Sequence, residues 1–173
     1  MAVKIFGNGT ITGYEPPVGG KIGQVIQEVK TDVFSTTVIY GTSCPTITGL
    51  SASITLTEST SKVLVSYTIF VSASGACHGG TILRRNGTNI FLSDSGTGIS
   101  GTAGHQLAPS NSNWGVQMET QNCLDNPGVG THTYSVGIGG NGSETLYVNR
   151  TGRLGATDPL GISQITLYEI LGE

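Results

Sequence analysis

Charge is scarce in this chain of 173 residues. Lys, Arg, Asp and Glu together make up 11% of the residues, less than half the roughly 25% that is usual in globular domains. The eight Lys and Arg residues and the net charge of -3 argue against a nucleic-acid module, whose affinity depends on clustered cations. No apolar run approaches the roughly 18 residues that a membrane-spanning helix requires. We therefore expect no nucleic-acid partner and no membrane insertion.

Cysteine and histidine are also few and widely spaced. The histidines, His78, His105 and His132, follow one another at steps of 27 residues without the carboxylate pattern that orients metal ligands. The sequence therefore predicts no metal site and no cofactor, and the alternative is that one histidine from each of three chains meets at a threefold axis around a metal or anion. An odd number of cysteines at wide spacings is not typical of a disulfide framework. We expect three small buried or half-buried side chains, and one disulfide plus a free thiol is the alternative. The cysteines are Cys44, Cys77 and Cys123.

Catalytic motifs are lacking as well. Residues 91–96 read Phe-Leu-Ser-Asp-Ser-Gly, which is similar to the aspartic-protease signature, and a homodimer would supply the second carboxylate. However, Asp-Ser-Gly is also an ordinary turn sequence, and no companion flap segment is evident. Residues 98–102 lack the final glycine of a nucleophile elbow. We expect no enzyme, and the protease alternative rests on Asp94.

Small residues that tolerate turns and strands dominate the sequence, with 27 Gly, 23 Thr and 17 Ser. An alternation of apolar and polar residues, the period of a half-buried strand, is clearest over residues 62–71. We expect the odd-numbered side chains of this segment to face a core. They are Val63, Val65, Tyr67, Ile69 and Val71. Further strands are expected over 24–29, 33–40, 50–56 and 162–171.

Two hairpins and no helix are expected. Asn86-Gly87 suits a type I′ turn in the segment 81–92. A second hairpin is predicted from 133–137 to 144–148, with its turn at 139–142. No segment keeps a 3.6-residue period for three turns. Roughly seven to nine short strands fit an antiparallel β-sandwich or jelly roll.

The first 20 residues differ from the rest. Pro16-Pro17 followed by Gly19-Gly20 cannot lie in a helix or a central strand, so this stretch marks a linker. We expect an extended arm over residues 1–20 and one globular domain over 21–173. The apolar side chains of the arm indicate that it docks on another protein, by adding to a sheet edge. The predicted anchoring residues are Val3, Ile5, Phe6 and Ile11.

Two features point to surfaces that bind. Residues 86–143 contain no Lys or Arg, and a neutral surface of this length is easiest to explain by contact with copies of itself. The tryptophan, Trp114, lies in an Asn- and Ser-rich loop with Asn111 and Asn113. An aromatic ring beside amide groups suits a sugar, so these three residues are candidates for a receptor or glycan site. The alternative is that Trp114 closes one end of the sandwich or a seam between subunits.

Several segments together resemble a known family. The stretch 23–37 (GQVIQEVKTDVFSTT), the strand 59–65 (STSKVLV) and the strand 162–170 (ISQITLYEI) carry most of the resemblance, supported by 49–55 and 148–151. They resemble the knob-like domains of tailed-bacteriophage virion proteins, of the cyanophage and marine-phage tail-fibre type. The resemblance covers about residues 21–173. Ile26 and an additional Val33 are departures from the family's pattern.

The resemblance implies a homotrimeric jelly roll, like the heads of tumour necrosis factor and complement proteins, located on the virion surface. It implies a structural or adhesive role without catalytic residues, with partners among copies of itself, other virion proteins and a host-surface glycan. Family members often carry a long shaft, and here 20 residues precede the knob. A short fibre with a host-adhesion tip and a capsid decoration (cement) protein therefore both remain open. A lectin-like glycan-binding module is the alternative class.

A threefold axis should be lined by neutral and apolar side chains, and the alternation does not decide which strand faces meet it. The candidates for the axis are Tyr67, Ile69, Tyr134, Tyr147, Leu167 and Tyr168.

Overall fold

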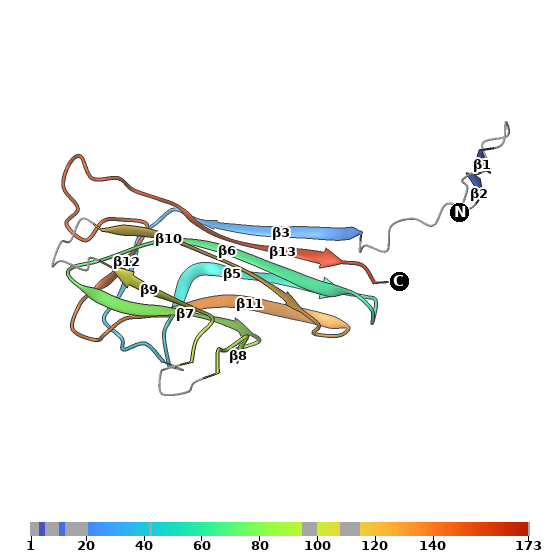
Figure 1. Cartoon of the computed structure of the whole chain (residues 1–173), viewed down its shortest axis with the longest axis horizontal. Coiled ribbons are helices and arrows are strands. Elements are labelled where there is room, and N and C mark those ends of the chain that lie inside the picture. The colour runs from blue at the N-terminus through green and yellow to red at the C-terminus, as the bar shows by residue number, and fades with distance from the viewer. Residues whose placement is uncertain are drawn as a thin grey trace.

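The computed structural model describes residues 21–41, 43–94, 100–104 and 115–172, together with the backbone of 4–5, 11–12 and 105–107. This part of the chain contains strands and no helix (Figure 1). No helix that could cross a membrane is therefore found among these residues. The strands are β1 (Lys4–Ile5), β2 (Ile11–Thr12), β3 (Ile22–Lys30), β4 (Phe34–Thr36), β5 (Thr46–Leu56), β6 (Lys62–Ala73), β7 (Cys77–Arg85), β8 (Thr88–Ile90), β9 (Ala103–Leu107), β10 (Val116–Asp125), β11 (Gly130–Gly139), β12 (Leu146–Val148) and β13 (Ser163–Ile170).

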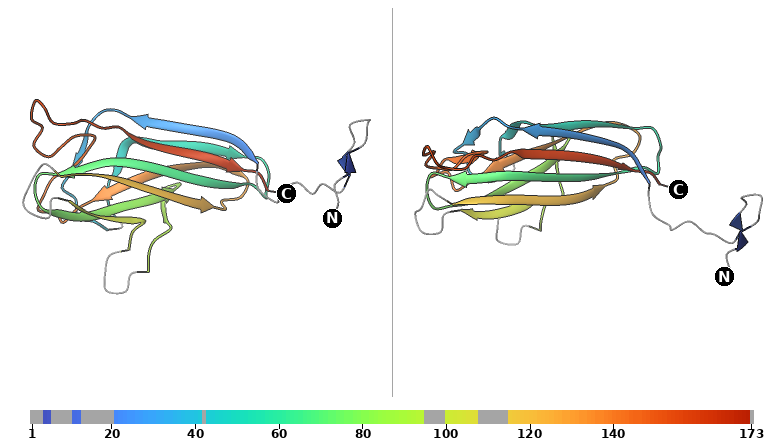
Figure 2. Two further views of the ribbon diagram at one scale, coloured as in Figure 1. Left: turned by 45° about the horizontal axis from the view of Figure 1, so that its top comes forward. Right: turned by 90° about the horizontal axis from the view of Figure 1, so that it is seen from above.

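Two antiparallel sheets lie face to face and form a β-sandwich (Figures 1 and 2). In sheet I, β6 pairs with β10 on one side and with β13 on the other, and β3 lies beyond β13. β12 and β4 continue this sheet beside the far end of β6. In sheet II the order is β5, β11, β7, and β8 and β9 share the free side of β7. The predicted all-β sandwich is confirmed.

The strand pairs are nested along the chain. β3 pairs with β13, β5 with β11, β6 with β10, and β7 with β8 and β9. Each pair in this series therefore encloses the next pair in sequence. Because the outermost pair joins the two ends of the body, Leu171 N donates a hydrogen bond to Lys21 O at 2.8 Å.

The core lies between the two sheets and is formed by alternate residues of each strand. In β6 the predicted inward set is confirmed, because Val63, Val65, Ile69 and Val71 are fully buried and Tyr67 is 1% exposed. Apolar side chains of β5, β7, β11, β12 and β13 complete the same cluster. Each such side chain contributes roughly 1.5–3 kcal/mol when fully buried, so this cluster is the main source of the sandwich's stability.

One predicted hairpin is confirmed and the other is wrong. Asn86 and Gly87 have φ values of 51° and 81°, as a type I′ turn requires. The segments 133–137 and 144–148 form no hairpin, because β11 belongs to sheet II and β12 to sheet I. Alternation along a strand reports burial of one face but not the identity of the neighbouring strand. The predicted strand 33–40 is likewise shorter, with only Phe34–Thr36 in β4.

Four of the six residues predicted for a threefold axis lie in the core instead. Tyr67, Ile69, Tyr134 and Leu167 are at most 1% exposed, because the opposite sheet of the same chain covers the face on which they lie. They therefore have no surface to offer a second chain. The other two, Tyr147 and Tyr168, are half-buried.

Candidate functional site: an uncharged sheet face and a glycine-lined hollow

An apolar row crosses the outer face of sheet I. The strand register aligns Val25 with Tyr168, Tyr168 with Leu64, and Leu64 with Leu124. The two ends of this row, Val25 and Leu124, are each 51% exposed. The solvent-facing side of an antiparallel sheet is normally polar, so an apolar row from β3 to β10 marks this face as unusual.

Several polar side chains of the same face bind each other. Gln27 Nε2 donates to Thr166 Oγ1 at 3.1 Å and to Gln164 Oε1 at 3.3 Å. The hydroxyl groups of Thr68 and Thr120 lie 3.0 Å apart and share a hydrogen bond. A polar group costs free energy on burial mainly when it loses its partner. Because these groups already have partners within the sheet, covering the face with another surface costs little.

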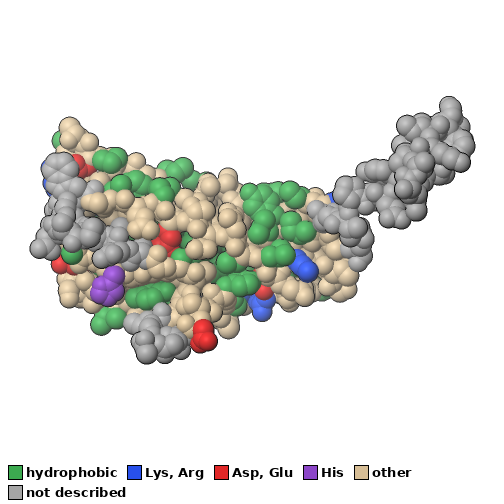
Figure 3. Space-filling view, viewed as in Figure 1, with side chains coloured by type: hydrophobic (Ala, Val, Ile, Leu, Met, Phe, Trp, Pro, Cys, Tyr) green, Lys and Arg blue, Asp and Glu red, His purple; other side chains and the backbone are tan. Residues whose placement is uncertain are grey.

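From Leu64 to Phe70 of β6, and at the positions beside them on β3, β13 and β10, no outward-facing residue is Lys, Arg, Asp, Glu or His, and we call this surface the uncharged face. Lys62, at the start of β6, lies just beyond it on the same side of the sheet. Charged side chains are also sparse in the side view of Figure 3. Contiguous exposed apolar surface marks an interaction site in a folded protein. The uncharged face consists of Val25, Gln27 and Val29 of β3, Gln164, Thr166 and Tyr168 of β13, Leu64, Ser66, Thr68 and Phe70 of β6, and Met118, Thr120, Asn122 and Leu124 of β10.

A second feature lies on the outer face of sheet II, where the chain after β4 crosses glycines. Ile39 forms a parallel bridge with Gly140. Tyr40 N donates to Gly140 O at 2.7 Å, and Gly140 N donates to Val38 O at 2.9 Å. A Cβ on Gly139 would lie 2.8 Å from Tyr40 Cα, so this close approach requires glycine. The result is that Tyr40 lies over the neighbouring strand β7.

The ring of Tyr40 occupies space that glycines leave free. A Cβ on Gly80 would lie 2.8 Å from its phenol oxygen, and a Cβ on Gly101 would overlap that oxygen. The hydroxyl donates to the carbonyl groups of Thr81 and Ala103, each at 3.4 Å. Burial raises the pKa of Tyr40 to about 12, with smaller contributions from the Cys44 thiol and the Glu119 carboxylate. The phenol is therefore neutral at physiological pH, and its hydroxyl is directed into the protein.

Two hollows meet at Tyr40 and Gly79. Their volumes are about 330 and 360 Å³, at the lower end of the range of ligand pockets. No charged residue lines either hollow in the part of the chain that the structure describes. The first is lined by Ile39, Tyr40, His78, Gly79, Gly140 and Asn141, and the second by Tyr40, Gly79, Ser93, Gly101, Thr102, Ala103 and Gly104.

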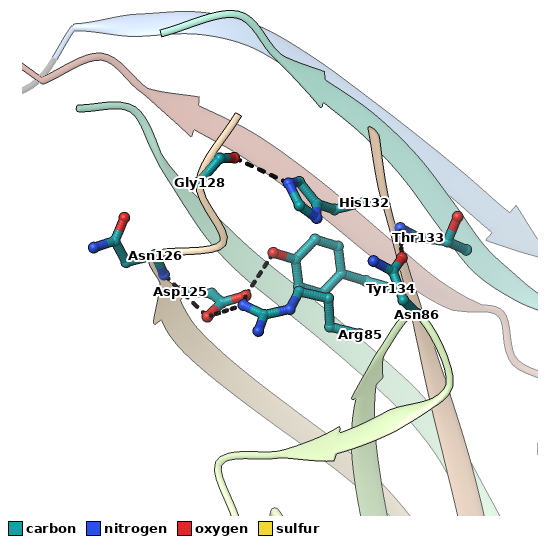
Figure 4. Close-up of polar contacts among 8 residues, drawn as sticks. All are labelled: Arg85, Asn86, Asp125, Asn126, Gly128, His132, Thr133 and Tyr134. Atoms are coloured by element: carbon teal, nitrogen blue, oxygen red, sulfur yellow. Dashed lines mark hydrogen bonds and ion pairs between the residues drawn. The ribbon is translucent and has the colours of Figure 1, made fainter. Parts of the chain in front are cut away.

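An ion pair with a buried carboxylate joins the two sheets near the other end of the sandwich (Figure 4). Arg85 Nη1 of β7 lies 2.9 and 2.7 Å from the two carboxylate oxygens of Asp125 on β10. The phenol of Tyr134 donates to Asp125 Oδ2 at 2.7 Å, and Asn126 N donates to Oδ1 at 3.0 Å. Both oxygens of the Asp125 carboxylate therefore accept hydrogen bonds. The cluster links β10 of sheet I to β7 and β11 of sheet II.

A second polar cluster crosses the core near Tyr40. Thr81 donates to the buried carboxylate of Glu119, and the hydroxyl groups of Tyr67 and Thr81 lie 2.8 Å apart. Thr81 is fully buried, and Glu119 is 4% exposed. Burial raises the pKa of Tyr67, so its hydroxyl stays protonated and available for hydrogen bonding. These contacts also connect β6 and β10 of sheet I with β7 of sheet II.

The other residues singled out from the sequence, where the structure describes them, do not come together at one site. Asp94 is exposed, and His78 and His132 lie on different strands of sheet II. His132 Nε2 donates to Gly128 O at 2.9 Å. No group of three potential metal ligands occurs among the described residues. Cys44, Cys77 and Cys123 are free thiols, so the disulfide alternative is wrong; burial raises the pKa of each of them.

Of the predicted arm, the structure describes only the backbone of β1 and β2, and it describes no residue of the loop that contains Trp114. β1 and β2 form a separate antiparallel pair in which Ile5 lies opposite Ile11. Tyr147, from the predicted axis, packs under Arg150, whose guanidinium carbon is 4.1 Å from the ring centre. Val3, Phe6, Asn111, Asn113 and Trp114 lie outside the described residues.

Comparison with known proteins gives little. No protein-family model matches the sequence, and no curated protein is similar to it at a significant level. Among solved structures, the chain is similar to the VP2 subviral particle of infectious bursal disease virus, with a TM-score of 0.30 and 13% sequence identity. The alignment covers 87% of this chain and 42% of the viral chain.

Proposed function

We propose that this chain is a non-enzymatic structural protein of a tailed-bacteriophage virion, a homotrimeric surface knob that assembles through the uncharged face of sheet I. The uncharged face is the observation that carries the proposal. Four strands about 4.8 Å apart, with about six residues rising about 3.3 Å each, span roughly 400 Å² in projection. The accessible area of the side chains exceeds that projection, and a standard interface buries about 800 Å² on each partner. The face is therefore large enough for contact between copies.

A second copy is the partner that suits this face best. A surface without charges has no sign to match, so identical chains meet there without repulsion. Several of its polar side chains are paired within the sheet, as Gln27 is with Thr166 and Thr68 is with Thr120, which lowers the cost of burying them. Its exposed apolar residues lie on both outer strands, with Val29 45% exposed on β3 and Met118 55% exposed on β10. A ring of three copies brings one outer strand of each chain against the other outer strand of the next.

The nested strand pairs support the jelly roll. An eight-stranded hairpin that rolls up into two sheets pairs its first strand with its last, its second with its seventh, and so on inward, which is the jelly-roll arrangement. The pairs β3–β13, β5–β11, β6–β10 and β7–β9 follow this series. Such knobs occur in the phage proteins that residues 23–37 and 162–170 resemble. The resemblance and the topology thus point to the same class of protein.

The oligomeric state tests the proposal directly. Light scattering coupled to size exclusion should give about 53 kDa, three times the 17.8 kDa of one chain. Leu124→Arg places a charge at the end of the apolar row and should reduce the mass to that of one chain. Thr48→Arg, at an exposed position of β5 in sheet II, is the matched control and should leave the trimer intact. A monomer in the unmodified protein would contradict the proposal.

Attachment to the particle is tested separately. We assign anchoring to the arm, residues 1–20, where Ile5 and Ile11 lie opposite each other in the β1–β2 pair. Deleting residues 2–16 should leave a folded trimer that no longer incorporates into phage particles. Incorporation at the normal level would show that another surface attaches the knob. Immunogold labelling of particles then decides between the two locations, a short fibre with a host-adhesion tip or a capsid decoration.

A further inference from the structure

The hollow around Tyr40 has the shape of a small-molecule site. Two cavities of about 330 and 360 Å³ share Tyr40 and Gly79, and glycines form much of their walls. A pocket of this size at a chain crossing admits a ligand of one or two rings. Since Tyr40 directs its hydroxyl to the carbonyl groups of Thr81 and Ala103, the ring itself is the part that faces the hollow.

The hollow is uncharged, which restricts the ligand. Neither cavity is lined by Lys, Arg, Asp or Glu among the described residues, and His78 supplies the sole ionisable group besides the phenol of Tyr40. A phosphate, a carboxylate or an ammonium group would find no opposite charge there. Such a ligand would lose its hydration without compensation. The ligand that fits is therefore neutral.

The lining also offers both kinds of contact that a neutral, hydroxyl-rich molecule needs. The ring of Tyr40 and the side chain of Ile39, which is 62% exposed, provide an apolar surface. The exposed imidazole of His78 has no hydrogen-bond partner within the described residues, and Ser93 Oγ accepts only a long bond, 3.4 Å, from Gly101 N. Asn141 has a different role, because its amide oxygen is already bonded to the backbone N–H groups of Ser143 and Glu144.

We propose that this hollow binds a neutral hexose unit of a glycan. The apolar face of the sugar stacks on Tyr40 and Ile39, and its hydroxyl groups bind His78 and Ser93. The inference does not depend on the proposed assembly, because the hollow lies on sheet II and the uncharged face lies on sheet I. A single chain and a trimer contain the same site.

Gly104 provides a sharp test because it lines the second cavity and tolerates a side chain. A Cβ there would lie 3.7 Å from the nearest atom, Gly79 O, which is an ordinary contact. Gly104→Val therefore fills the cavity and keeps the fold. His78→Ala removes a hydrogen-bonding group from the first cavity. Thr48→Val, on exposed β5 of the same sheet, is the matched control.

The probes are the methyl glycosides of glucose, galactose and mannose, N-acetylglucosamine, and glucuronate as the charged comparison. Ligand-observed NMR should show millimolar binding of at least one neutral sugar and none of glucuronate. Gly104→Val should weaken that binding at least about tenfold, or about 1.4 kcal/mol, His78→Ala should weaken it several-fold, and Thr48→Val should leave it unchanged. No binding of the neutral sugars, equal binding of glucuronate, or an unaffected Gly104→Val variant would each overturn the inference. Light scattering on the same samples keeps this result separate from the oligomeric state.

Discussion

Tyr134 and Asp125 are joined across the sandwich by a hydrogen bond of 2.7 Å between the phenol and Oδ2. Tyr134 lies on β11 of sheet II and Asp125 lies on β10 of sheet I. Since Tyr134 is fully buried, its hydroxyl has no access to water as a substitute partner. Burial and the Asp125 carboxylate both raise the pKa of Tyr134, so the phenol is protonated at neutral pH and can donate this bond.

Removing this link should destabilise the protein in a graded way. Tyr134→Phe loses one hydrogen bond to a charged group, which is worth about 1.5–3 kcal/mol. Asp125→Ala removes the same bond and also leaves the buried Tyr134 hydroxyl unpaired. This variant should therefore lose more free energy of unfolding than Tyr134→Phe. The Arg85 side chain is 31% exposed and is rehydrated, so the lost ion pair adds little. Urea unfolding, followed by circular dichroism, measures the free energy of unfolding of both variants. Equal losses in the two variants would contradict the hydrogen bond from the Tyr134 phenol to Asp125.

Acid should weaken the loop between β12 and β13. Asp158 Oδ2 accepts hydrogen bonds from Gly155 N at 2.7 Å and Thr151 Oγ1 at 3.0 Å, and its carboxylate pairs with Arg153. Arg153, and then the Gly155 N–H group, hold the pKa of Asp158 well below its usual value. A carboxyl with a lowered pKa stabilises the fold above about pH 4, the unfolded value, and this stability is lost as the pH falls further.

Thermal unfolding of the native chain and of Asp158→Asn tests this linkage. The melting temperature of the native protein should exceed that of the variant at neutral pH, and the gap should narrow steadily from about pH 4 downward. A gap that is constant with pH would show that the Asp158 carboxylate contributes nothing as a charge.

Two glycines near Tyr40 should respond differently to the same change. A Cβ on Gly101 would overlap the phenol oxygen of Tyr40, whereas a Cβ on Gly104 meets nothing closer than 3.7 Å. Gly101→Ala should therefore lower the free energy of unfolding by about 1–3 kcal/mol, the usual range for overpacking. Gly104→Ala should leave it within about 0.5 kcal/mol. Chemical denaturation of the two variants measures this difference in the free energy of unfolding. Equal changes in both variants would mean that Tyr40 does not pack on Gly101.

Disulfide trapping should reveal how copies meet at the uncharged face. Val25 and Leu124 lie at opposite ends of the apolar row, three strand spacings or about 14 Å apart, which is too far for a disulfide within one chain. In a closed ring of three chains, the double variant Val25→Cys/Leu124→Cys should therefore oxidise to covalent trimers. Each single variant should oxidise far less. If the single variants form covalent dimers as readily, the contact joins like surfaces, and non-reducing gel electrophoresis distinguishes the two patterns.

Local patterns predicted several strands, because a half-buried strand records its own burial, but β9 and β10 were not among the expected segments. The alternation in 62–71 gave the inward side chains of β6, and Asn86-Gly87 gave the turn between β7 and β8. The sequence also contained the outward series Leu64, Ser66, Thr68 and Phe70, but an isolated strand does not show which strands lie beside it. Only the register, which aligns Leu64 with Tyr168 and Leu124, turns separate apolar residues into a row.

The side chains proposed for a threefold axis show why one strand's pattern was not enough. Tyr67 and Tyr134 were candidates for an axis because large uncharged side chains suit one, yet the same property suits a core. Their hydroxyl groups bind Thr81 and Asp125 inside the sandwich. The hollow around Tyr40 had no local signal either, because its glycines come from three separate segments of the chain, 79–80, 101–104 and 139–140. Contacts between residues that lie far apart in the chain arise from tertiary structure and leave no periodicity in the sequence.

The hydrogen bond between Leu171 N and Lys21 O has a consequence for engineering. The body of the protein begins and ends at neighbouring points at one end of the sandwich (Figure 1). A domain whose ends adjoin can be grafted into a surface loop of a carrier with little strain on either. Residues 21–172 therefore constitute a cassette that a host scaffold can display, with both sheets unaltered.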